Sequence, residues 1–123
     1  MLSQRELARY ERQILIPEWT KVGQEKLKKA KVLVAGVGGL GSAILTYLAV
    51  AGVGRIKIID GDKVELSNLN RQVLHTDRDI GRDKVDSAKE KLELLNPDIK
   101  VEAIKEIITE NNVFDLVGDY PIV

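Results

Sequence analysis

The feature that most constrains this chain is a glycine-rich turn between a predicted strand and a predicted helix. Residues 31–36 read KVLVAG, a short apolar, β-branched run that is typical of a parallel strand buried on both faces. Residues 39–51 are small and apolar almost throughout, which predicts a helix pressed closely against a sheet. The turn between them carries four glycines: Gly36, Gly38, Gly39 and Gly41. In this context the glycine pattern predicts a turn that binds phosphate groups.

Each glycine is expected to have its own physical role in that turn. Gly36 permits the tight change of direction after the strand. Gly38 and Gly39 let phosphate oxygens approach bare backbone N–H groups at the positive end of the helix. Gly41 lets the helix lie against the strand. The turn therefore predicts a nucleotide site.

The order of the elements predicts the fold class. We expect strands at 31–36, 55–60, 100–107 and 121–123, and helices at 39–51, 81–96 and 109–117. Strands that alternate with helices form a parallel sheet with right-handed crossovers. The prediction is an α/β, Rossmann-like parallel sheet of strand order 3-2-1-4, with helices on both faces, truncated at its fourth strand.

Two short helices are predicted before the sheet. Ser3 and Glu6 match a capping box at the start of a helix that runs to about residue 15. Pro17 interrupts it, and Thr20 is expected to cap a second helix through Lys29. The expected organisation is a helical segment at 1–30 and an incomplete Rossmann-like ATP-binding domain at 31–123.

Composition excludes several functional classes. Nineteen basic residues balance nineteen acidic ones, so no global field favours nucleic acid, and no apolar run approaches the roughly 18 residues that span a membrane. With no cysteine, the chain contains no disulfide, thiol nucleophile or zinc ribbon, and a zinc site of that kind is impossible within it. The N-terminus does not resemble a signal peptide, so the expected location is cytoplasmic.

Asp60 follows Gly41 by 19 residues and ends the second predicted strand. A carboxylate at that position accepts the hydroxyl hydrogens of a ribose, which places an adenosine across the strand ends. The turn and Asp60 together indicate an adenine nucleotide, and NAD, FAD and ATP all fit them.

The connection after the second strand is more specific. Residues 64–72 read VELSNLNRQ and residues 81–84 read GRDK. The chain resembles the MoeB/ThiF/HesA family of ubiquitin-activating-enzyme-like adenylyltransferases. The resemblance rests on four features in this order and spacing: GxGGLG, a strand ending in Asp, LSNLxRQ and G-x-x-K. The resemblance runs from about residue 10 to Val123 and corresponds to the N-terminal, nucleotide-binding half of such enzymes.

That resemblance implies a function and partners. Family members use ATP to adenylylate the C-terminal carboxylate of a ubiquitin-fold sulfur-carrier protein that ends in Gly-Gly, as in molybdopterin or thiamine biosynthesis, and they form homodimers. It also implies nucleotide contacts for Gly36, Gly38, Gly39, Gly41, Asp60, Ser67, Asn68, Leu69, Asn70, Arg71 and Lys84. The residues implied to act in catalysis are Arg12, Asn68, Arg71 and Lys84, with Arg12 reaching the triphosphate of the partner subunit. Attack on the α-phosphate expels pyrophosphate, whose accumulating charge independently requires fixed cations.

Some family features are missing from these residues. The D-x-x-D-N segment, whose aspartate holds Mg²⁺ in the family, would follow the fourth strand, and the sequence stops before it. No metal ligand is therefore assigned here, although Mg²⁺ is expected for the family. Pro121 stands where many relatives carry an acidic residue.

Two alternatives stay open. An NAD-binding oxidoreductase would explain the glycines and Asp60 but not Asn68, Arg71 and Lys84. A catalytically incomplete fragment that acts only in nucleotide binding or dimerisation would also explain the motifs. His75 has no acidic or thiol partner nearby in sequence and is not predicted to be catalytic. Trp19 is expected to anchor the N-terminal segment by packing.

Overall fold

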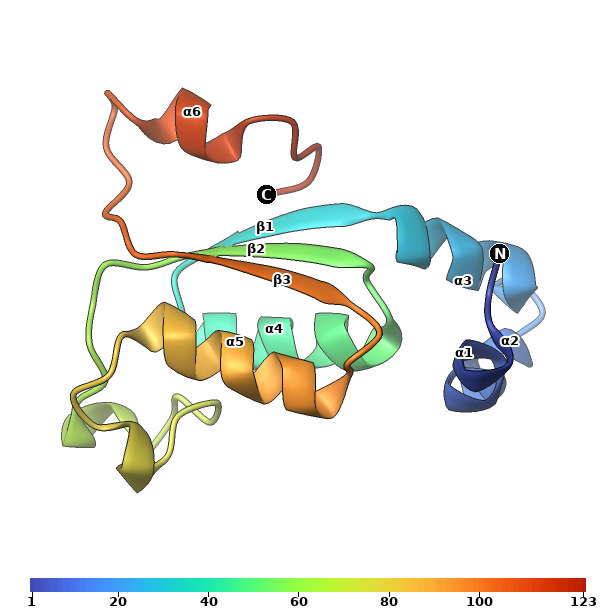
Figure 1. Ribbon diagram of the computed structural model, residues 1–123, viewed down its shortest axis with the longest axis horizontal. Helices are drawn as coiled ribbons and strands as arrows, with labels where there is room; N and C mark the ends of the chain where they lie inside the picture. The colour runs from blue at the N-terminus through green and yellow to red at the C-terminus, as the bar shows by residue number, and fades with distance from the viewer.

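The computed structural model describes residues 1–123 and contains a three-stranded parallel sheet. The strands are β1 (Lys31–Ala35), β2 (Arg55–Ile59) and β3 (Lys100–Ile104), in the order β1-β2-β3. Lys31 pairs with Arg55, and Arg55 pairs with Lys100, so the three strands begin in register and end at the same edge (Figure 1). The predicted parallel α/β sheet is confirmed for these three strands.

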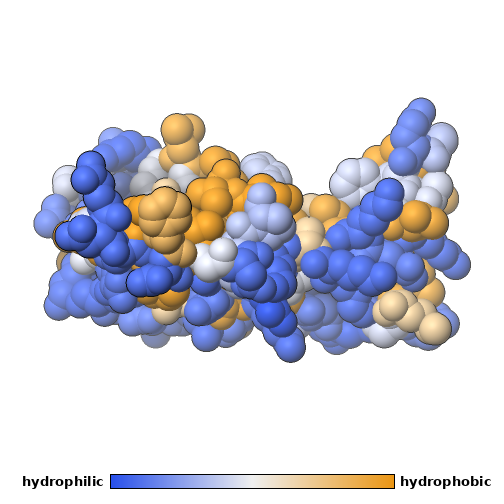
Figure 2. Space-filling view, turned by 90° about the horizontal axis from the view of Figure 1, so that it is seen from above, coloured by the Kyte–Doolittle hydropathy of each residue, from blue (hydrophilic) through white to orange (hydrophobic).

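Helices cover both faces of the sheet (Figure 1). On one face lie α4 (Gly39–Ala51) and α5 (Lys84–Leu95), which enclose the main core with the inward side chains of the strands. Its fully buried members include Leu45, Ile56, Ile58 and Leu92. On the other face α6 (Val113–Val117) packs a smaller cluster of Leu33, Ile59, Leu116 and Tyr120. Figure 2 shows apolar side chains gathered over the middle of that second side, which α6 covers only in part.

The expected fourth strand is represented by a single bridge. Ile122 makes one isolated parallel bridge with Val32, and its carbonyl accepts a hydrogen bond from the Leu33 N–H at 2.9 Å. Pro121 has no N–H to donate to a ladder, and no further bridge joins this segment to β1. The observed order is therefore 3-2-1, and the fourth position remains a prediction.

Three short helices precede the sheet instead of two: α1 (Gln4–Arg9), α2 (Glu11–Ile14) and α3 (Thr20–Lys29). The capping box is confirmed, because the Glu6 N–H donates to Ser3 Oγ at 3.1 Å and the Ser3 N–H donates to the Glu6 carboxylate at 2.7 Å. The expected single helix to residue 15 was wrong. The helix breaks at Tyr10, whose side chain is buried and whose hydroxyl oxygen accepts a hydrogen bond from Asn96 Nδ2 at 2.8 Å, 86 positions along the chain.

The N-terminal segment is fastened to α4 through Gln24, which is fully buried. Gln24 Oε1 accepts from Trp19 Nε1 at 3.0 Å and from Gln13 Nε2 at 2.9 Å. Its own amide donates to the Ala51 carbonyl at the end of α4. Trp19 therefore anchors the segment by a hydrogen bond, where the sequence had suggested packing. Thr20 is the first residue of α3 and not its cap, and its hydroxyl accepts from the Val22 N–H.

Other helix and strand boundaries also differ from those predicted. The helix expected from residue 81 begins at Lys84, since Asp83 is extended and forms an antiparallel bridge with Lys63. Strand β3 ends at Ile104 and not at 107, and α6 begins at Val113 and not at 109. The connection at 61–79 contains two 3₁₀ helices that were not expected, η1 (Leu66–Asn68) and η2 (Asp77–Asp79). No helix of the structure has the length and apolar character needed to cross a membrane.

Asp79 ties this connection to α5. Its side chain is 2% exposed and accepts from the Thr76 N–H and hydroxyl, from Arg82 Nη1 and from Lys91 Nζ at 2.6 Å. Burial alone would raise the pKa of the Asp79 carboxyl, but the bonds from Lys91 and Thr76 outweigh it and hold the pKa well below its ordinary value.

We expect Asp79→Asn to lower the free energy of unfolding at pH 7 by about 2–3 kcal/mol, because it weakens several charge-assisted hydrogen bonds. The folded-state pKa lies below the unfolded value of about 3.9, so this stabilisation is present above pH 4 and is lost as the pH falls further. Urea unfolding at several pH values measures the difference between wild type and variant. The exposed neighbour Asp77→Asn is the control. A difference that persists undiminished at pH 2 would contradict the assignment.

Candidate functional site

The glycine turn lies at the carboxyl end of β1, and its geometry explains two of its four glycines. Gly36 has φ +96°, a left-handed conformation that other residues rarely adopt. A Cβ on Gly41 would lie 2.1 Å from the Gly36 carbonyl oxygen. Gly38 and Gly39 differ, because a Cβ there would meet only side-chain atoms of Gln72 at 3.9 Å and of Arg71 at 3.5 Å. Packing within the chain therefore does not require glycine at these two positions.

The turn presents unsatisfied donors. Gly38 precedes α4 without any side-chain cap, so the first N–H groups of the helix lack the usual side-chain acceptor. Such donors at the positive end of a helix form a ready anion site.

Asp60 lies directly beside the turn. Its Oδ2 accepts from the Val37 N–H at 2.8 Å, and its Oδ1 accepts from the Asp62 N–H at 2.8 Å. A pocket of about 350 Å³ opens here at the ends of the three strands, lined by Gly36, Asp60, Asp62 and Glu106 among others. The structure therefore brings Gly36 and Asp60 together, as the sequence predicted.

The connection at 61–79 folds back over the turn and brings Arg71 to Gly39. The Arg71 guanidinium donates from Nη1 to the Ser67 carbonyl at 3.2 Å and to Asn70 Oδ1 at 3.0 Å. Ser67 and Asn70 thus orient Arg71, while Leu69 between them is half-buried. The aliphatic part of Arg71 runs along Gly39, with its guanidinium exposed to solvent.

Asn68 and Lys84 meet in a second pocket of about 180 Å³, which Asp62, Lys63 and Glu65 also line. Lys84 is only 6% exposed, and its Nζ lies 4.0 Å from Asp62 Oδ2. Asp62 lines both pockets, so they adjoin at this residue. Two cations, Arg71 and Lys84, consequently belong to the same end of the sheet as the glycine turn.

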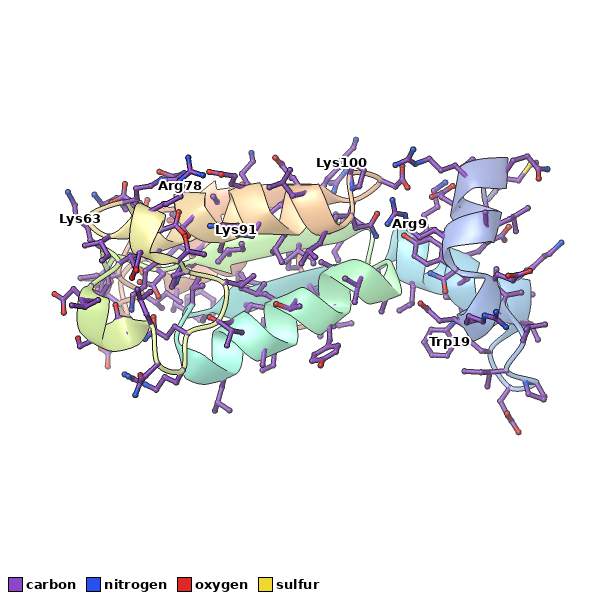
Figure 3. The ribbon with its side chains drawn as sticks, turned by 90° about the horizontal axis from the view of Figure 1, so that it is seen from below. Arg9, Trp19, Lys63, Arg78, Lys91 and Lys100 are labelled. Atoms are coloured by element: carbon purple, nitrogen blue, oxygen red, sulfur yellow. The ribbon has the colours of Figure 1, made fainter.

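Arg12 is not brought to this site. It is exposed on α2, at the amino-terminal end of the strands, whereas the glycine turn lies at their carboxyl end (Figure 1). Figure 3 shows the same separation, with Lys63 of the second pocket at one end of the molecule and Trp19 at the other. Within one chain, Arg12 cannot act on a ligand at the turn.

Three residues of the site were missed in the sequence. Asp62 faces Lys84, Gln72 is 4% exposed beside Gly38 with no partner for its Oε1, and His75 is 4% exposed with two partners. Gln72 follows Arg71 in the motif, a signal that was available. No acidic or thiol partner was expected near His75 in the sequence, and its hydroxyl partner Ser87 lies twelve positions further along the chain.

No group of three His, Cys, Asp or Glu side chains comes together in a way that would hold a metal ion. Because Mg²⁺ often binds through one or two carboxylates together with substrate phosphates, the Mg²⁺ that the resemblance implies stays a prediction.

Comparison with known proteins agrees with these features. The profile described as the ThiF family matches residues 10–123. A sulfur carrier protein adenylyltransferase of Thermus thermophilus is 46% identical over 118 residues, which cover 96% of this chain and 44% of that protein.

Solved structures agree as well. The crystal structure of PaaA superposes with a TM-score of 0.91 at 41% identity, covering 97% of this chain and 40% of that one. The E. coli protein MccB, solved with ATP, superposes with a TM-score of 0.79 at 36% identity, covering 87% of this chain and 33% of that one. The chain spans less than half the length of each of these relatives.

Proposed function

The chain belongs to the ThiF family, and from this premise we propose that it is the nucleotide-binding half of an enzyme that adenylylates the C-terminal carboxylate of a ubiquitin-fold sulfur-carrier protein. The main observation in support is that the Arg71 side chain lies against Gly39. Lys84 and Asn68 line the adjoining pocket. Fixed cations beside a phosphate-binding turn suit a triphosphate substrate, whereas hydride transfer would not require them.

The turn and Asp60 would hold the nucleotide. Since packing does not require glycine at positions 38 and 39, close approach of phosphate oxygens to the backbone is the remaining physical reason for them. Each Asp60 oxygen accepts one backbone hydrogen bond and keeps a lone pair for a ribose hydroxyl. Asn68 offers an amide to the phosphates, and Ser67, Leu69 and Asn70 shape the loop that carries Arg71.

In the proposed reaction a carboxylate oxygen of the carrier attacks the α-phosphorus of ATP. A new P–O bond forms, the bond to the bridging oxygen of the β-phosphate breaks, and pyrophosphate leaves with that electron pair. Arg71 and Lys84 would neutralise the charge that accumulates on the leaving group. Mg²⁺, held by residues outside those described here, would supply further charge neutralisation.

Incorporation of labelled pyrophosphate into ATP tests this function in the full-length protein. We expect exchange that requires a carrier ending in Gly-Gly and disappears when the last glycine is removed. Calorimetric titration compares the affinities for NAD and ATP and so distinguishes the oxidoreductase alternative from the proposed function. Tight NAD binding without exchange would reject the proposal, and exchange by the 123 residues alone would reject the incomplete-fragment alternative.

We also propose that two copies associate through α4, which carries an exposed apolar stripe at helical spacing: Leu40, Ile44 and Tyr47. Gln13 donates to the Ala51 carbonyl, so α2 is tied to the C-terminal end of α4, while the glycine turn begins its N-terminal end. A two-fold axis that packs α4 antiparallel to its counterpart would bring Arg12 of each copy to the turn of the other.

Mixing two inactive variants checks this arrangement. Full-length Arg12→Ala and Lys84→Met are each expected to lose most exchange activity, and their mixture to regain about a quarter of the wild-type activity, because half of the random dimers then hold one complete site. The control mixes Arg71→Ala with Lys84→Met. Each of these changes damages the site of the protomer that carries it, so the mixed dimer holds no complete site and should not regain activity. Dimers shown to have exchanged subunits without regaining activity would reject the shared site.

The free edge of β1 supports the expected strand order. A groove of about 570 Å³ there is lined only by apolar residues, among them Val32, Ile44, Leu48, Ile122 and Val123. We propose that the residues at 121–123 mark the position of the fourth strand beside β1, giving the order 3-2-1-4. The bridge from Ile122 to Val32 supports this placement. The division at residue 30 and the cytoplasmic location also stay predictions.

A further inference from the structure

His75 is buried between the glycine turn and α5, and both of its ring nitrogens are engaged. Nε2 lies 3.3 Å from the carbonyl oxygen of Val37, within the turn. Nδ1 lies 2.8 Å from the hydroxyl oxygen of Ser87, on α5. Val37 and Ser87 are themselves completely buried, and His75 is only 4% exposed, so these contacts are shielded from bulk solvent.

The partners determine which nitrogen carries the proton. A carbonyl oxygen only accepts hydrogen bonds, so Nε2 must be protonated and donate to Val37. In the neutral ring, which burial favours, Nδ1 then accepts from the Ser87 hydroxyl. Burial lowers the pKa of His75 below its ordinary value, and nearby Lys84 acts in the same direction, against the opposing effects of the Val37 bond and Asp79.

Val37 is held from its other side by Asp60. The Val37 N–H donates to Asp60 Oδ2 at 2.8 Å, while its carbonyl accepts from His75. The two peptide groups of Val37 are therefore fixed between the end of β2 and the ring of His75. Because Ser87 follows Lys84 by three residues on α5, nearly one helical turn, the chain of contacts continues to the helix that carries Lys84.

We propose that His75 is a positioning residue that sets the spacing between the glycine turn and Lys84. It does not touch the substrate. It fixes the position of the backbone N–H groups of the turn relative to the Lys84 ammonium group, so that both can bind the same triphosphate. This inference rests on the proposed function, because it assumes that ATP is the ligand.

Three substitutions separate the two contacts. His75→Phe keeps a ring but removes both hydrogen bonds. The amide of His75→Gln reaches the position of Nε2 and retains the donor to Val37, whereas His75→Asn places its oxygen near Nδ1 and retains only the acceptor for Ser87. The full-length variants are compared in the exchange assay for KM(ATP) and kcat, and their stability is measured by urea unfolding.

We expect His75→Phe to raise KM(ATP) by about 10- to 100-fold, as loss of a supporting contact does in other sites. His75→Gln should restore KM to within a few-fold of wild type, and His75→Asn should resemble Phe. A folded His75→Phe protein with unchanged KM and kcat would overturn the proposal. If that variant does not fold, the Gln and Asn variants decide, and equal KM values for these two would also overturn it. Absence of exchange in the wild type would instead reject the proposed function itself.

Discussion

Replacing Gly41 with alanine is expected to lower the free energy of unfolding by about 3 kcal/mol and to abolish ATP binding. The new Cβ would lie 2.1 Å from the Gly36 carbonyl oxygen and 3.0 Å from its carbon, both backbone atoms that no rotamer change can move away. The helix α4 must then move off β1 and carry the N–H groups of the turn with it. Urea unfolding measures the first effect and calorimetric titration with ATP the second.

Gly39→Ala is the matched comparison in the same turn. Its Cβ would make ordinary contacts with Arg71 side-chain carbons at 3.5 Å, so stability should stay within about 0.5 kcal/mol of wild type. If phosphate oxygens approach the backbone here, as proposed, affinity for ATP should still fall by at least about tenfold. Wild-type stability of Gly41→Ala would refute the packing argument. Wild-type ATP affinity of Gly39→Ala would refute the phosphate contact.

Removal of either cation is expected to lower activity strongly in the proposed reaction. Arg71→Ala and Lys84→Met should each lower carrier-dependent exchange by about 10²- to 10³-fold, because each withdraws a fixed positive charge from the leaving pyrophosphate. Arg71→Lys should recover little, since an ammonium group cannot replace the two-pronged guanidinium that Ser67 and Asn70 orient.

The exposed Arg78, on η2, provides the control for these charge changes. Arg78→Ala alters net charge by the same amount as Arg71→Ala but should leave exchange within about twofold of wild type. Unfolding measurements are needed beside the kinetics, because Lys84 is buried. A stable Lys84→Met protein with exchange near the wild-type level would remove Lys84 from the site.

Local pattern predicted most of the sheet. The β-branched runs at Lys31 and Arg55 became β1 and β2, and the small-residue stretch after Gly39 became α4. These predictions succeeded because burial on both faces, helical periodicity and glycine conformation are properties of neighbouring residues. Boundaries failed where a distant residue intervened, as when Asp83 was held in a bridge with Lys63 and α5 began later than expected.

The residues of the candidate site also fall into two groups, according to whether local spacing could assign them. Gly36, Gly41 and Asp60 could be assigned from spacing alone, since one strand, one turn and the next strand bring them together. Asn68, Arg71 and Lys84 were assigned only through the family resemblance. From the sequence alone, Arg71 and Lys84 could equally be solvated surface charges. The folding of the connection at 61–79 brings Arg71 onto Gly39.

The sequence by itself determined the glycine turn and the parallel α/β architecture around it, because sterics and periodicity act within a few residues. The tertiary structure decided which residues face that turn. The bond from Asn96 to Tyr10, the contact of His75 with Ser87, and the separation of Arg12 from Asp60 all depend on where distant segments come to lie. Such contacts follow from packing of the whole chain, and no local pattern encodes them.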